Sequence, residues 1–291
     1  MMKKGILLAG GSGTRLAPLS LAVCKQILPI YDKPMIYYPL STLLLAGIQD
    51  ICLISTPKDL PLFKQMLGTG ESFGVKFTYL EQDKPRGIAD AFRVARDFVA
   101  GESMCLVLGD NIFFGHQLPK LLERAAARTS GATIFGYQVG DPESFGVVEF
   151  DKNSGKAISI EEKPKNPKSK YAVVGLYFYD HHVTEYAEKL RPSTRGELEI
   201  TDLNRMYMEH SALTVETMGR GMAWLDTGSF ESLLQASNFV QTIEKRQGLK
   251  ISCPEEIAWR KGFISTSQLK DLALKYRSSG YGDYLSKLLE E

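Results

Sequence analysis

The 291-residue chain carries 35 Lys and Arg residues against 34 Asp and Glu, a formal net charge of +1, and 44% of its residues are apolar. This composition supports a large buried core in one or two domains, and the lack of a basic excess argues against a nucleic-acid partner. The longest apolar stretch, residues 35–48, is interrupted by polar residues and is shorter than the ~20 apolar residues that span a membrane. The N-terminal apolar segment is too short for a secretion signal, so we expect a cytoplasmic protein without a membrane partner.

The cysteines and histidines indicate neither a metal site nor a nucleophile. The four cysteines are far apart, without CxxC spacing, and are expected to be reduced structural thiols. The four histidines have no ligand spacing, which argues against zinc chemistry, and no nucleophile elbow accompanies them. These residues are Cys24, Cys52, Cys105 and Cys253, and His116, His181, His182 and His210.

The first half of the chain alternates short apolar strands with amphipathic helices. This alternation predicts βαβ units, and hence a Rossmann-like, mostly parallel sheet of an α/β protein, flanked by helices on both faces. The expected strands are residues 5–9, 51–55, 75–80, 104–108 and 132–139, and the expected helices are residues 35–46, 60–67, 88–99 and 118–129.

The pattern changes from Gly146 onward. Strands are expected at residues 147–150, 157–161 and 173–179 with little helix between them, and the Lys/Pro-rich residues 162–171 are expected to be a loop. Helices are expected at residues 183–190 and 199–210, then at 230–247, with shorter ones after residues 252 and 266. We therefore expect an inserted β region within a core of residues 1–228, in halves 1–140 and 141–228, and a C-terminal helical appendage of residues 229–291.

A glycine-rich loop follows the first predicted strand. Its sequence, Gly-Gly-Ser-Gly-Thr-Arg at residues 10–15, lets backbone N–H groups approach a phosphate without Cβ clashes. Open α/β sheets bind ligands beyond the carboxyl ends of their strands, which is where this loop lies. The loop lacks the Gly-Lys-Ser/Thr of a Walker A motif, and Leu16 replaces the last glycine of the dinucleotide fingerprint. A plain strand-to-helix turn is the alternative.

Two cations follow the glycines. Arg15 offers planar bidentate donors to a phosphate, and Lys25 offers a point charge. Together with the loop they favour a triphosphate site, although each alone is typical of a solvated surface.

Two carboxylates follow apolar segments far apart in the chain. Asp110 ends the segment Leu-Val-Leu-Gly-Asp, and Asp226 ends Ala-Trp-Leu-Asp. Carboxylates at strand ends suit Mg²⁺, which prefers oxygen ligands and usually bridges carboxylates and phosphates, so the two could converge on one ion. The alternatives are an Asx turn at Asp110 and an N-cap at Asp226.

A third charged segment, Glu-Glu-Lys-Pro at residues 161–164, closes a predicted strand. Glu162 could accept hydrogen bonds from sugar hydroxyls, and Lys163 could bind a sugar phosphate. A charged hairpin end without a ligand is the alternative.

The ordered set of these motifs strongly resembles the bacterial glucose-1-phosphate thymidylyltransferases, members of the sugar-nucleotidyltransferase family. The similarity extends over essentially the whole chain and includes Gly-Leu-Tyr-Phe-Tyr-Asp at residues 175–180, Arg-Gly-Glu-Leu-Glu-Ile-Thr-Asp at 195–202 and Trp-Leu-Asp-Thr-Gly at 224–228. The resemblance implies that dTTP and α-D-glucose 1-phosphate give dTDP-glucose and pyrophosphate. This reaction is the first step of dTDP-deoxysugar synthesis, such as that of dTDP-rhamnose for bacterial polysaccharides.

The resemblance also implies a role for each matching residue. The triphosphate would be held by Gly10, Gly11, Gly13, Thr14, Arg15 and Lys25, and the nucleoside by Gln26, Gln82, Pro85 and Gly87. Asp110 and Asp226 would bind Mg²⁺, and Arg15, Lys25 and Asp110 would be catalytic. The sugar phosphate would be held by Gly146, Glu162, Lys163, Val173, Tyr177 and Arg195, with Trp224 nearby.

In the implied chemistry, an oxygen of glucose 1-phosphate attacks the α-phosphorus in line. This phosphate is already ionised at pH 7, so no general base is needed, and catalysis depends on positioning and charge stabilisation. Three residues depart from the family pattern: Ala17, where a larger residue is usual, Phe145, where Tyr is frequent, and Val174, where Thr is common. We still expect the protein to be active, and these changes bear on its selectivity for the sugar.

For the helical tail, the resemblance implies a homotetramer with a regulatory nucleotide-sugar site near a subunit interface. A purely structural tail is the alternative. The candidate regulatory residues are Gly219, Arg220, Gly221, Lys250, Cys253, Glu256 and Arg260.

Three other functions compete with this interpretation. The same chemistry with UTP or another nucleoside triphosphate is the nearest, because one methyl or hydroxyl group separates the substrates. A non-catalytic nucleotide-sugar sensor is expected to lose Arg15, Lys25, Asp110 or Asp226, and all four are present. A glycosyltransferase would more often carry an Asp-x-Asp motif, which neither aspartate belongs to.

Overall fold

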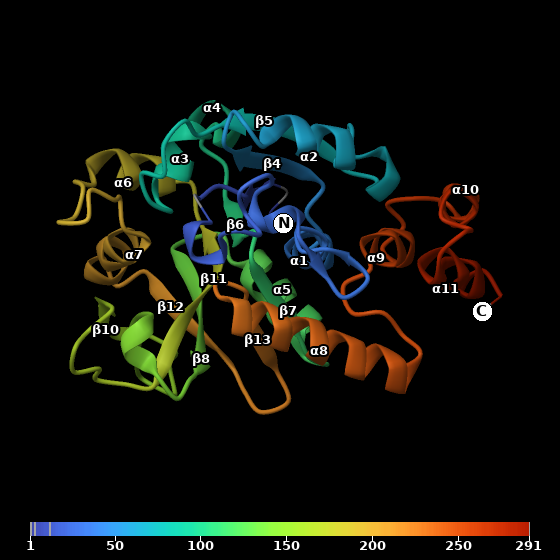
Figure 1. The fold of residues 1–291 in the computed structure, drawn as a ribbon. Helices are drawn as coiled ribbons and strands as arrows, with labels where there is room; N and C mark the ends of the chain where they lie inside the picture. The colour runs from blue at the N-terminus through green and yellow to red at the C-terminus, as the bar shows by residue number, and fades with distance from the viewer. Residues whose placement is uncertain (1, 3, 12, 291) are drawn as a thin grey trace.

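The computed structural model describes residues 2, 4–11 and 13–290, and within them the centre of the molecule is a nine-stranded sheet. The sheet order is β10-β9-β11-β6-β1-β4-β5, and β8 pairs with β11 and β12 (Figure 1). The strands are β1 (Lys4–Leu8), β4 (Asp50–Ser55), β5 (Lys76–Glu81), β6 (Met104–Leu108), β8 (Ala132–Gln138), β9 (Gly146–Phe150), β10 (Ala157–Glu162), β11 (Tyr171–Tyr179) and β12 (Leu213–Met218).

The first half of the chain supplies most of the parallel pairs in this sheet, and β12 adds another by pairing with β8. Strands β6, β1, β4 and β5 pair in parallel, with Leu8 of β1 opposite both Ile54 and Leu108. β11 then runs antiparallel to both β6 and β8, which makes the sheet mixed. The carboxyl ends of β1 and β6 therefore meet at one edge, where the glycine loop and Asp110 begin.

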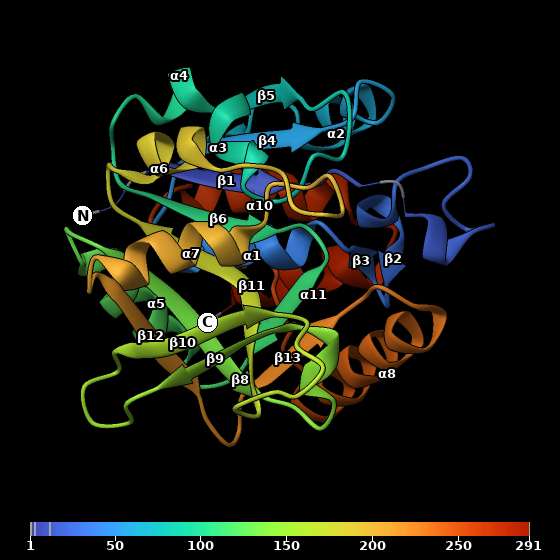
Figure 2. The ribbon, with the colours of Figure 1, turned by 90° about the vertical axis from the view of Figure 1, so that its left-hand side faces the viewer.

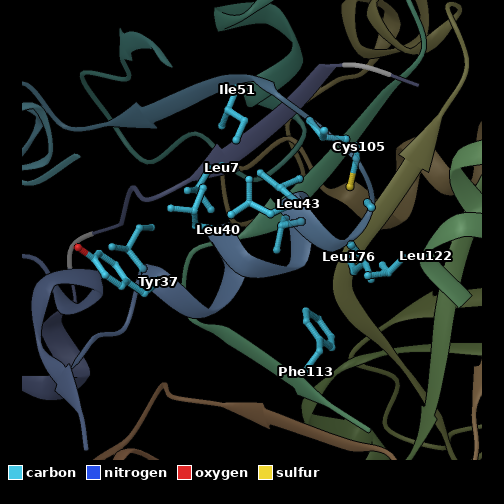
Figure 3. Close-up of a cluster of buried hydrophobic side chains, with 14 of the residues drawn as sticks. Leu7, Tyr37, Leu40, Leu43, Ile51, Cys105, Phe113, Leu122 and Leu176 are labelled. Carbon is cyan, nitrogen blue, oxygen red and sulfur yellow. The ribbon is translucent and has the colours of Figure 1, made fainter. Parts of the chain in front are cut away.

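Helices cover both faces of the sheet, because the buried strands are apolar on both sides. In β1, Leu7 packs in one cluster and Ile6 in another on the opposite face. Figure 3 shows Leu7 and Leu176 beside Leu40 and Leu43 of the first helix. The first face is covered by α1 (Tyr37–Leu45), α2 (Leu60–Leu67) and α5 (Leu118–Ala127), and the second by α3 (Asp90–Val94), α4 (Arg96–Val99), α6 (Val183–Lys189) and α7 (Ile200–Glu209).

Two small sheets were not expected from the sequence. β7 (Asn111–Phe114) pairs with β13 (Ala223–Asp226), and β2 (Pro29–Ile30) forms a hairpin with β3 (Lys33–Pro34). Their strands are short, and their partners are set by tertiary contacts. β7 begins directly after Asp110, so this carboxylate lies between two strands.

The C-terminal segment is helical, as expected. It comprises α8 (Phe230–Gln247), α9 (Pro254–Arg260), α10 (Thr266–Lys275) and α11 (Gly280–Leu288). Ser229 caps α8 through a capping box with Ser232, so Asp226 is not its N-cap. α8 packs on β2 and β13, whereas α9 to α11 lie at the end of the molecule away from β9 and β10 (Figures 1 and 2).

Other expectations were confirmed with small differences. The expected helix at residues 88–99 is broken at Ala95, where the backbone leaves helical geometry, giving α3 and α4. The expected loop at 162–171 contains no helix and is bounded by β10 and β11. All four cysteines are free and buried. No helix in the described residues is long and apolar enough to cross a membrane.

Candidate active site

The glycine loop leaves the carboxyl end of β1 and lines a cavity of about 260 Å³, here called the loop cavity. Gly11 and Gly13 have φ angles of +115° and +58°, in the left-handed region that favours glycine. The Ser20 hydroxyl closes the loop by donating to the Gly13 carbonyl at 2.7 Å. The loop residue Ser12 lies outside the described residues. The lining residues are Gly10, Gly11, Gly13, Thr14, Arg15, Leu16, Lys25, Pro85, Glu197 and Gly228.

Two glutamines predicted to contact a nucleoside lie beside Gly10. Gln26 donates through Nε2 to the Gly10 carbonyl at 3.3 Å, and a Cβ on Gly10 would lie 3.3 Å from Oε1 of Gln82. Gln82 is buried and donates to Asp90 at 2.8 Å. The buried Oε1 of Gln26 has no hydrogen-bond partner within the described part of the chain, which leaves one acceptor for a ligand. Neither glutamine lines a described cavity.

Gly87 brings two segments of the site together. Its φ angle is +99°, and a Cβ there would lie 2.4 Å from the Leu198 carbonyl oxygen, so no larger residue fits without movement. The Leu198 amide donates to the Arg86 carbonyl at 2.7 Å. This close approach places Pro85 and Glu197 in the same cavity, although Gly87 itself does not line it.

The structure brings the two predicted metal carboxylates together. Asp226 at the end of β13 lies opposite Asn111 of β7 in the strand register, and both aspartates line one cavity. Lys25 donates to Oδ2 of Asp110. The buried Thr227 hydroxyl donates to the Asp110 backbone carbonyl at 2.9 Å, which ties the two strand ends together.

The electrostatics of this pair favour a cation. Burial raises the pKa of Asp226 to about 6, and the negative charge of Asp110 adds to the effect. Burial would also raise the pKa of Asp110, but the positive charge of Lys25 outweighs it and lowers that pKa. Two half-buried carboxylates that repel each other, and that offer only oxygen ligands, match the donor set that Mg²⁺ prefers.

The cavity that holds the aspartates, here called the strand cavity, also has a volume of about 260 Å³. Arg15 and Glu197 line both this cavity and the loop cavity, so the two adjoin. All seven residues predicted for the sugar phosphate line the strand cavity: Gly146, Glu162, Lys163, Val173, Tyr177, Arg195 and Trp224. They come from β9, β10, β11, β13 and two loops that are far apart in the sequence.

An ion-pair network orders the polar wall of the strand cavity. Glu162 accepts from the Thr201 hydroxyl at 2.6 Å and from Nη2 of Arg195 at 3.3 Å. Arg195 also donates to Glu199 at 2.7 Å and lies 3.7 Å from Glu197, so its charge is held by three carboxylates. The Glu199 hydrogen bond accordingly raises the pKa of Arg195 despite partial burial.

Sequence reasoning missed several residues of the strand cavity. Glu197, Glu199 and Thr201 belong to the segment 195–202, which carried the resemblance without a role for each member. That segment was the only feature of the sequence that pointed to these three residues. Asn111 and Gly175 also line the cavity, and β7, which places Asn111, was not expected.

The three departures from the family pattern lie in different environments. Phe145 lines the strand cavity with its ring centroid 5.2 Å from that of Trp224, so the missing hydroxyl leaves an apolar wall. Val174 is fully buried in the core, and its neighbours Val173 and Gly175 are the ones that line the cavity. Ala17 is exposed and lines neither cavity. Only Phe145 is thus placed to affect a ligand directly.

The structure does not bring the predicted regulatory residues together within one chain. Gly219, Arg220 and Gly221 line a separate cavity of about 800 Å³ beside β8 and β12. The remaining four lie in the C-terminal segment, where Lys250 is paired with Asp32 and Glu244, Cys253 is buried, and Glu256 accepts from Arg260 at 2.8 Å.

Two histidines lie beside a carboxylate, contrary to the expectation that the histidines lack ligand spacing. Ligand atoms of Asp180, His181 and His182 lie within 4.8 Å of one another. The Asp180 carboxylate already accepts hydrogen bonds from the Gly131 amide at 2.6 Å and the Tyr207 hydroxyl at 2.9 Å. We therefore assign Asp180 a structural role, outside both cavities of the site.

Comparison with known proteins agrees with this geometry. A family model described as nucleotidyl transferase matches residues 4–243. The chain belongs to the nucleotidyl transferase family. It is 56% identical over 288 residues to a glucose-1-phosphate thymidylyltransferase of Neisseria meningitidis serogroup A, a match that covers 99% of this chain and 100% of the relative. The resemblance inferred from the motifs is confirmed.

A further relative and two solved structures are also similar to the chain. A glucose-1-phosphate thymidylyltransferase of Xanthomonas campestris is 57% identical, with 98% of this chain and 97% of the relative covered. A crystal structure from Bacillus anthracis, assigned as the same enzyme and containing sucrose, superposes with a TM-score of 0.75 at 43% identity, covering 82% of this chain and 95% of that one. A UDP-glucose pyrophosphorylase bound to UDP-glucose, 22% identical, shares the fold with a TM-score of 0.73 over 84% of this chain and all of that one.

Proposed function

We propose that this nucleotidyltransferase forms dTDP-glucose and pyrophosphate from dTTP and α-D-glucose 1-phosphate. The observation that carries the proposal is the joining of two cavities at Arg15. One is lined by the glycine loop and Lys25, and the other by both aspartates and by every residue predicted for the sugar phosphate. A nucleoside triphosphate and a sugar phosphate bound side by side would meet at this arginine.

The loop cavity suits the triphosphate. Its glycines leave backbone N–H groups close to a bound anion, and Arg15 and Lys25 supply positive charge. A neutral amide such as that of Gln26 or Gln82 would match the donor and acceptor pattern of the pyrimidine edge.

The strand cavity suits the sugar phosphate. Glu162 and the neighbouring carboxylates offer acceptors for sugar hydroxyls, whereas Lys163 and Arg195 offer positive charge to the phosphate. The aromatic side chains Trp224, Phe145 and Tyr177 would cover the apolar face of the ring.

We propose Mg²⁺ as the cofactor, held by Asp110 and Asp226. The fit rests on two half-buried carboxylates in one cavity, one of which has its pKa raised to about 6 beside the other. Mg²⁺ bound there would offset the negative charge of the phosphates.

The residues of the chain supply positioning and charge stabilisation. A phosphate oxygen of glucose 1-phosphate forms a bond to the α-phosphorus, and the bond to the β-phosphate oxygen breaks, so pyrophosphate leaves with that electron pair. Arg15 and Lys25, which line the loop cavity, would stabilise the charge on the leaving group. The phosphate nucleophile is already ionised, and no histidine is among the residues that line either cavity.

Pyrophosphate release tests the proposal directly. Each of dTTP, UTP and ATP is combined with glucose, galactose and mannose 1-phosphates, with and without Mg²⁺. We expect the greatest release with dTTP, glucose 1-phosphate and Mg²⁺. No release with that combination would refute the proposed reaction. Equal release with and without Mg²⁺ would refute the proposal that Mg²⁺ is the cofactor.

UTP is the second nucleotide that the site could accept. UTP lacks the thymine methyl and carries a 2′-hydroxyl that dTTP does not have. A methyl in an apolar pocket is worth only ~1–3 kcal/mol, so we expect the missing methyl alone to favour dTTP by about 10- to 200-fold. Release with UTP but not dTTP would identify a different nucleotide specificity within the same family.

We also propose that the protein is a homotetramer with a regulatory nucleotide-sugar site, and that its product feeds dTDP-deoxysugar synthesis. The separation of Gly219, Arg220 and Gly221 from the C-terminal candidates in one chain is compatible with a site completed by another subunit. Light scattering on the purified protein and inhibition assays with dTDP-sugars test these points. A monomer that no dTDP-sugar inhibits would refute them.

A further inference from the structure

Asn111 lies between the Asp110 carboxylate and the aromatic wall of the strand cavity. It is the first residue of β7, only 3% exposed, and it lines the strand cavity. Its side chain makes three hydrogen bonds to groups on three different segments. These groups are the Asp110 carboxylate, the Trp224 indole and the Gly175 backbone amide.

The hydrogen bonds determine which way the amide points. Oδ1 of Asn111 accepts from Nε1 of Trp224 at 2.6 Å and from the Gly175 amide at 3.0 Å. Both partners can only donate, so the oxygen must face them. The NH₂ group therefore faces Asp110, where it donates to Oδ1 at 2.9 Å.

Asn111 orients the Asp110 carboxylate without neutralising it. Each carboxylate oxygen receives one donor, Oδ1 from Asn111 and Oδ2 from Lys25. Lys25 carries a charge that the proposed triphosphate would also attract, whereas the amide of Asn111 is neutral. Its hydrogen bond thus preserves the negative charge that a cation needs.

The same amide fixes one wall of the strand cavity. The Trp224 ring lies edge-on to Phe145 and Tyr137, and its indole N–H is held by Asn111. Close packing against Gly175 locks the arrangement, because a Cβ there would lie 2.7 Å from Oδ1 of Asn111.

We propose that Asn111 is a positioning residue that holds the Asp110 carboxylate and the Trp224 indole in one fixed arrangement, so that the metal and sugar-phosphate sites are aligned. The inference rests on the proposed function. It adds a residue that acts through Asp110 and Trp224, by orienting both groups from a single buried amide.

Two substitutions distinguish the hydrogen bond to Asp110 from the hydrogen bonds to Trp224 and Gly175. Asn111→Asp keeps an oxygen toward Trp224 and Gly175 but places a second carboxylate oxygen against Asp110. We expect kcat to fall at least tenfold, with the KM for glucose 1-phosphate within twofold of the wild type. Asn111→Leu removes all three hydrogen bonds, and we expect a similar loss of kcat together with a KM at least fivefold higher.

Trp224 fluorescence reports the arrangement without turnover. The chain has two tryptophans, so Trp259→Phe leaves Trp224 as the single emitter. In this background and without ligands, we expect Asn111→Leu to shift the emission maximum and Asn111→Asp to leave it unchanged. If Asn111→Leu does not fold, Trp224→Phe removes the same N–H donor, and we expect it to raise the KM at least threefold.

Asn204→Asp is the matched control. Asn204 is also a fully buried amide, it accepts from the Tyr179 hydroxyl at 2.6 Å, and it lies outside both cavities. We expect this change to lower the melting temperature without altering the KM.

Wild-type kcat in Asn111→Asp, or unchanged emission and KM in Asn111→Leu, would overturn the inference. An inactive wild-type protein would instead refute the proposed function, while the fluorescence comparison would still test the arrangement.

Discussion

Arg15 and Lys25 are both cations of the loop cavity, but their surroundings differ. Lys25 is largely buried and paired with Asp110, so its removal would leave a carboxylate without its partner. Arg15 is exposed and lines both cavities. A change at Arg15 therefore separates the effect on catalysis from the effect on folding.

We expect Arg15→Ala to lower kcat by about 10²–10³-fold, the range found when one preorganised charge donor is removed from an active site. The melting temperature should stay within about 1 °C, because exposed substitutions rarely change stability by more than ~0.5 kcal/mol. Pyrophosphate-release kinetics and thermal melts measure the two effects. Arg191→Ala, an exposed arginine outside both cavities, is the control, and near-wild-type turnover in Arg15→Ala would contradict the assignment.

Asp226 is a residue whose position next to Asp110 should reduce the stability of the ligand-free protein. Its pKa in the folded protein is raised to about 6 from an ordinary 3.8. Because its pKa is raised, the protonated Asp226 side chain contributes fully to stability below pH ~4. This contribution is lost as the pH rises through 6. The ionised form then opposes folding by up to about 3 kcal/mol, the equivalent of a shift of about two pKa units.

We therefore expect Asp226→Asn to stabilise the ligand-free protein at pH 8 by about 1–3 kcal/mol and to have little effect at pH 4. The same change should abolish Mg²⁺-dependent activity, because it removes an anionic ligand. Urea unfolding at the two pH values measures the first effect. The surface variant Asp97→Asn should show no such pH dependence, and a destabilised Asp226→Asn at pH 8 would contradict the electrostatic argument.

At the scale of elements, buried charges join the β2–β3 hairpin to the end of α8. The Lys33 side chain is 1% exposed and lies 2.6 Å from Asp32 and 3.1 Å from Glu244. Lys250 pairs with the same two carboxylates, so two cations and two anions alternate. The hairpin follows the short 3-10 helix that carries Lys25, so this network also anchors the segment leading to the active site.

Removing one charged side chain from this network should lower the free energy of unfolding. We expect Lys33→Met to lower the free energy of unfolding by about 3–5 kcal/mol, because it leaves Glu244 buried without one of its partners. Lys33→Met combined with Glu244→Leu should recover most of that loss, since a packed apolar pair often replaces a buried ion pair at little cost. Denaturant unfolding of the two variants tests this, and a double variant no more stable than the single one would contradict it.

At the scale of the whole molecule, the C-terminal helices complete the core. Ala236 and Val240 of α8 pack in one cluster with Ile30, Tyr38 and Ile112 from the first half of the core. α9 packs against α1 on the first face of the sheet. The division at residue 228, inferred from the sequence, therefore separates segments that share buried surface.

We expect a fragment of residues 1–228 to be insoluble or to lose cooperative unfolding. Removing the tail exposes the cluster beside α8 and leaves Lys33 buried without Glu244. Size-exclusion chromatography and circular dichroism melts, with the full chain as control, provide the test. A monodisperse fragment with a sharp melt would show that residues 229–291 are a true appendage.

The sequence by itself determined the class of fold, the strand ends that carry the chemistry, and the family. Apolar periodicity is a local property, so it predicts β1, β4, β6 and most helices without knowledge of their neighbours. The glycine loop, Asp110 and Asp226 were found for the same reason, since each directly follows or ends a local apolar segment.

The tertiary structure alone decided which of these groups meet. The strands β7 and β13 are short and lie far apart in the sequence, so no local pattern indicates that Asn111 lies opposite Asp226. The alternation of charge among Asp32, Lys33, Glu244 and Lys250 likewise depends on burial that composition does not reveal. Contacts between distant segments are set by packing of the whole core. The sequence therefore indicated that Asp110 and Asp226 could meet, whereas the placement of Asn111 and of the network around Lys33 came only from the structure.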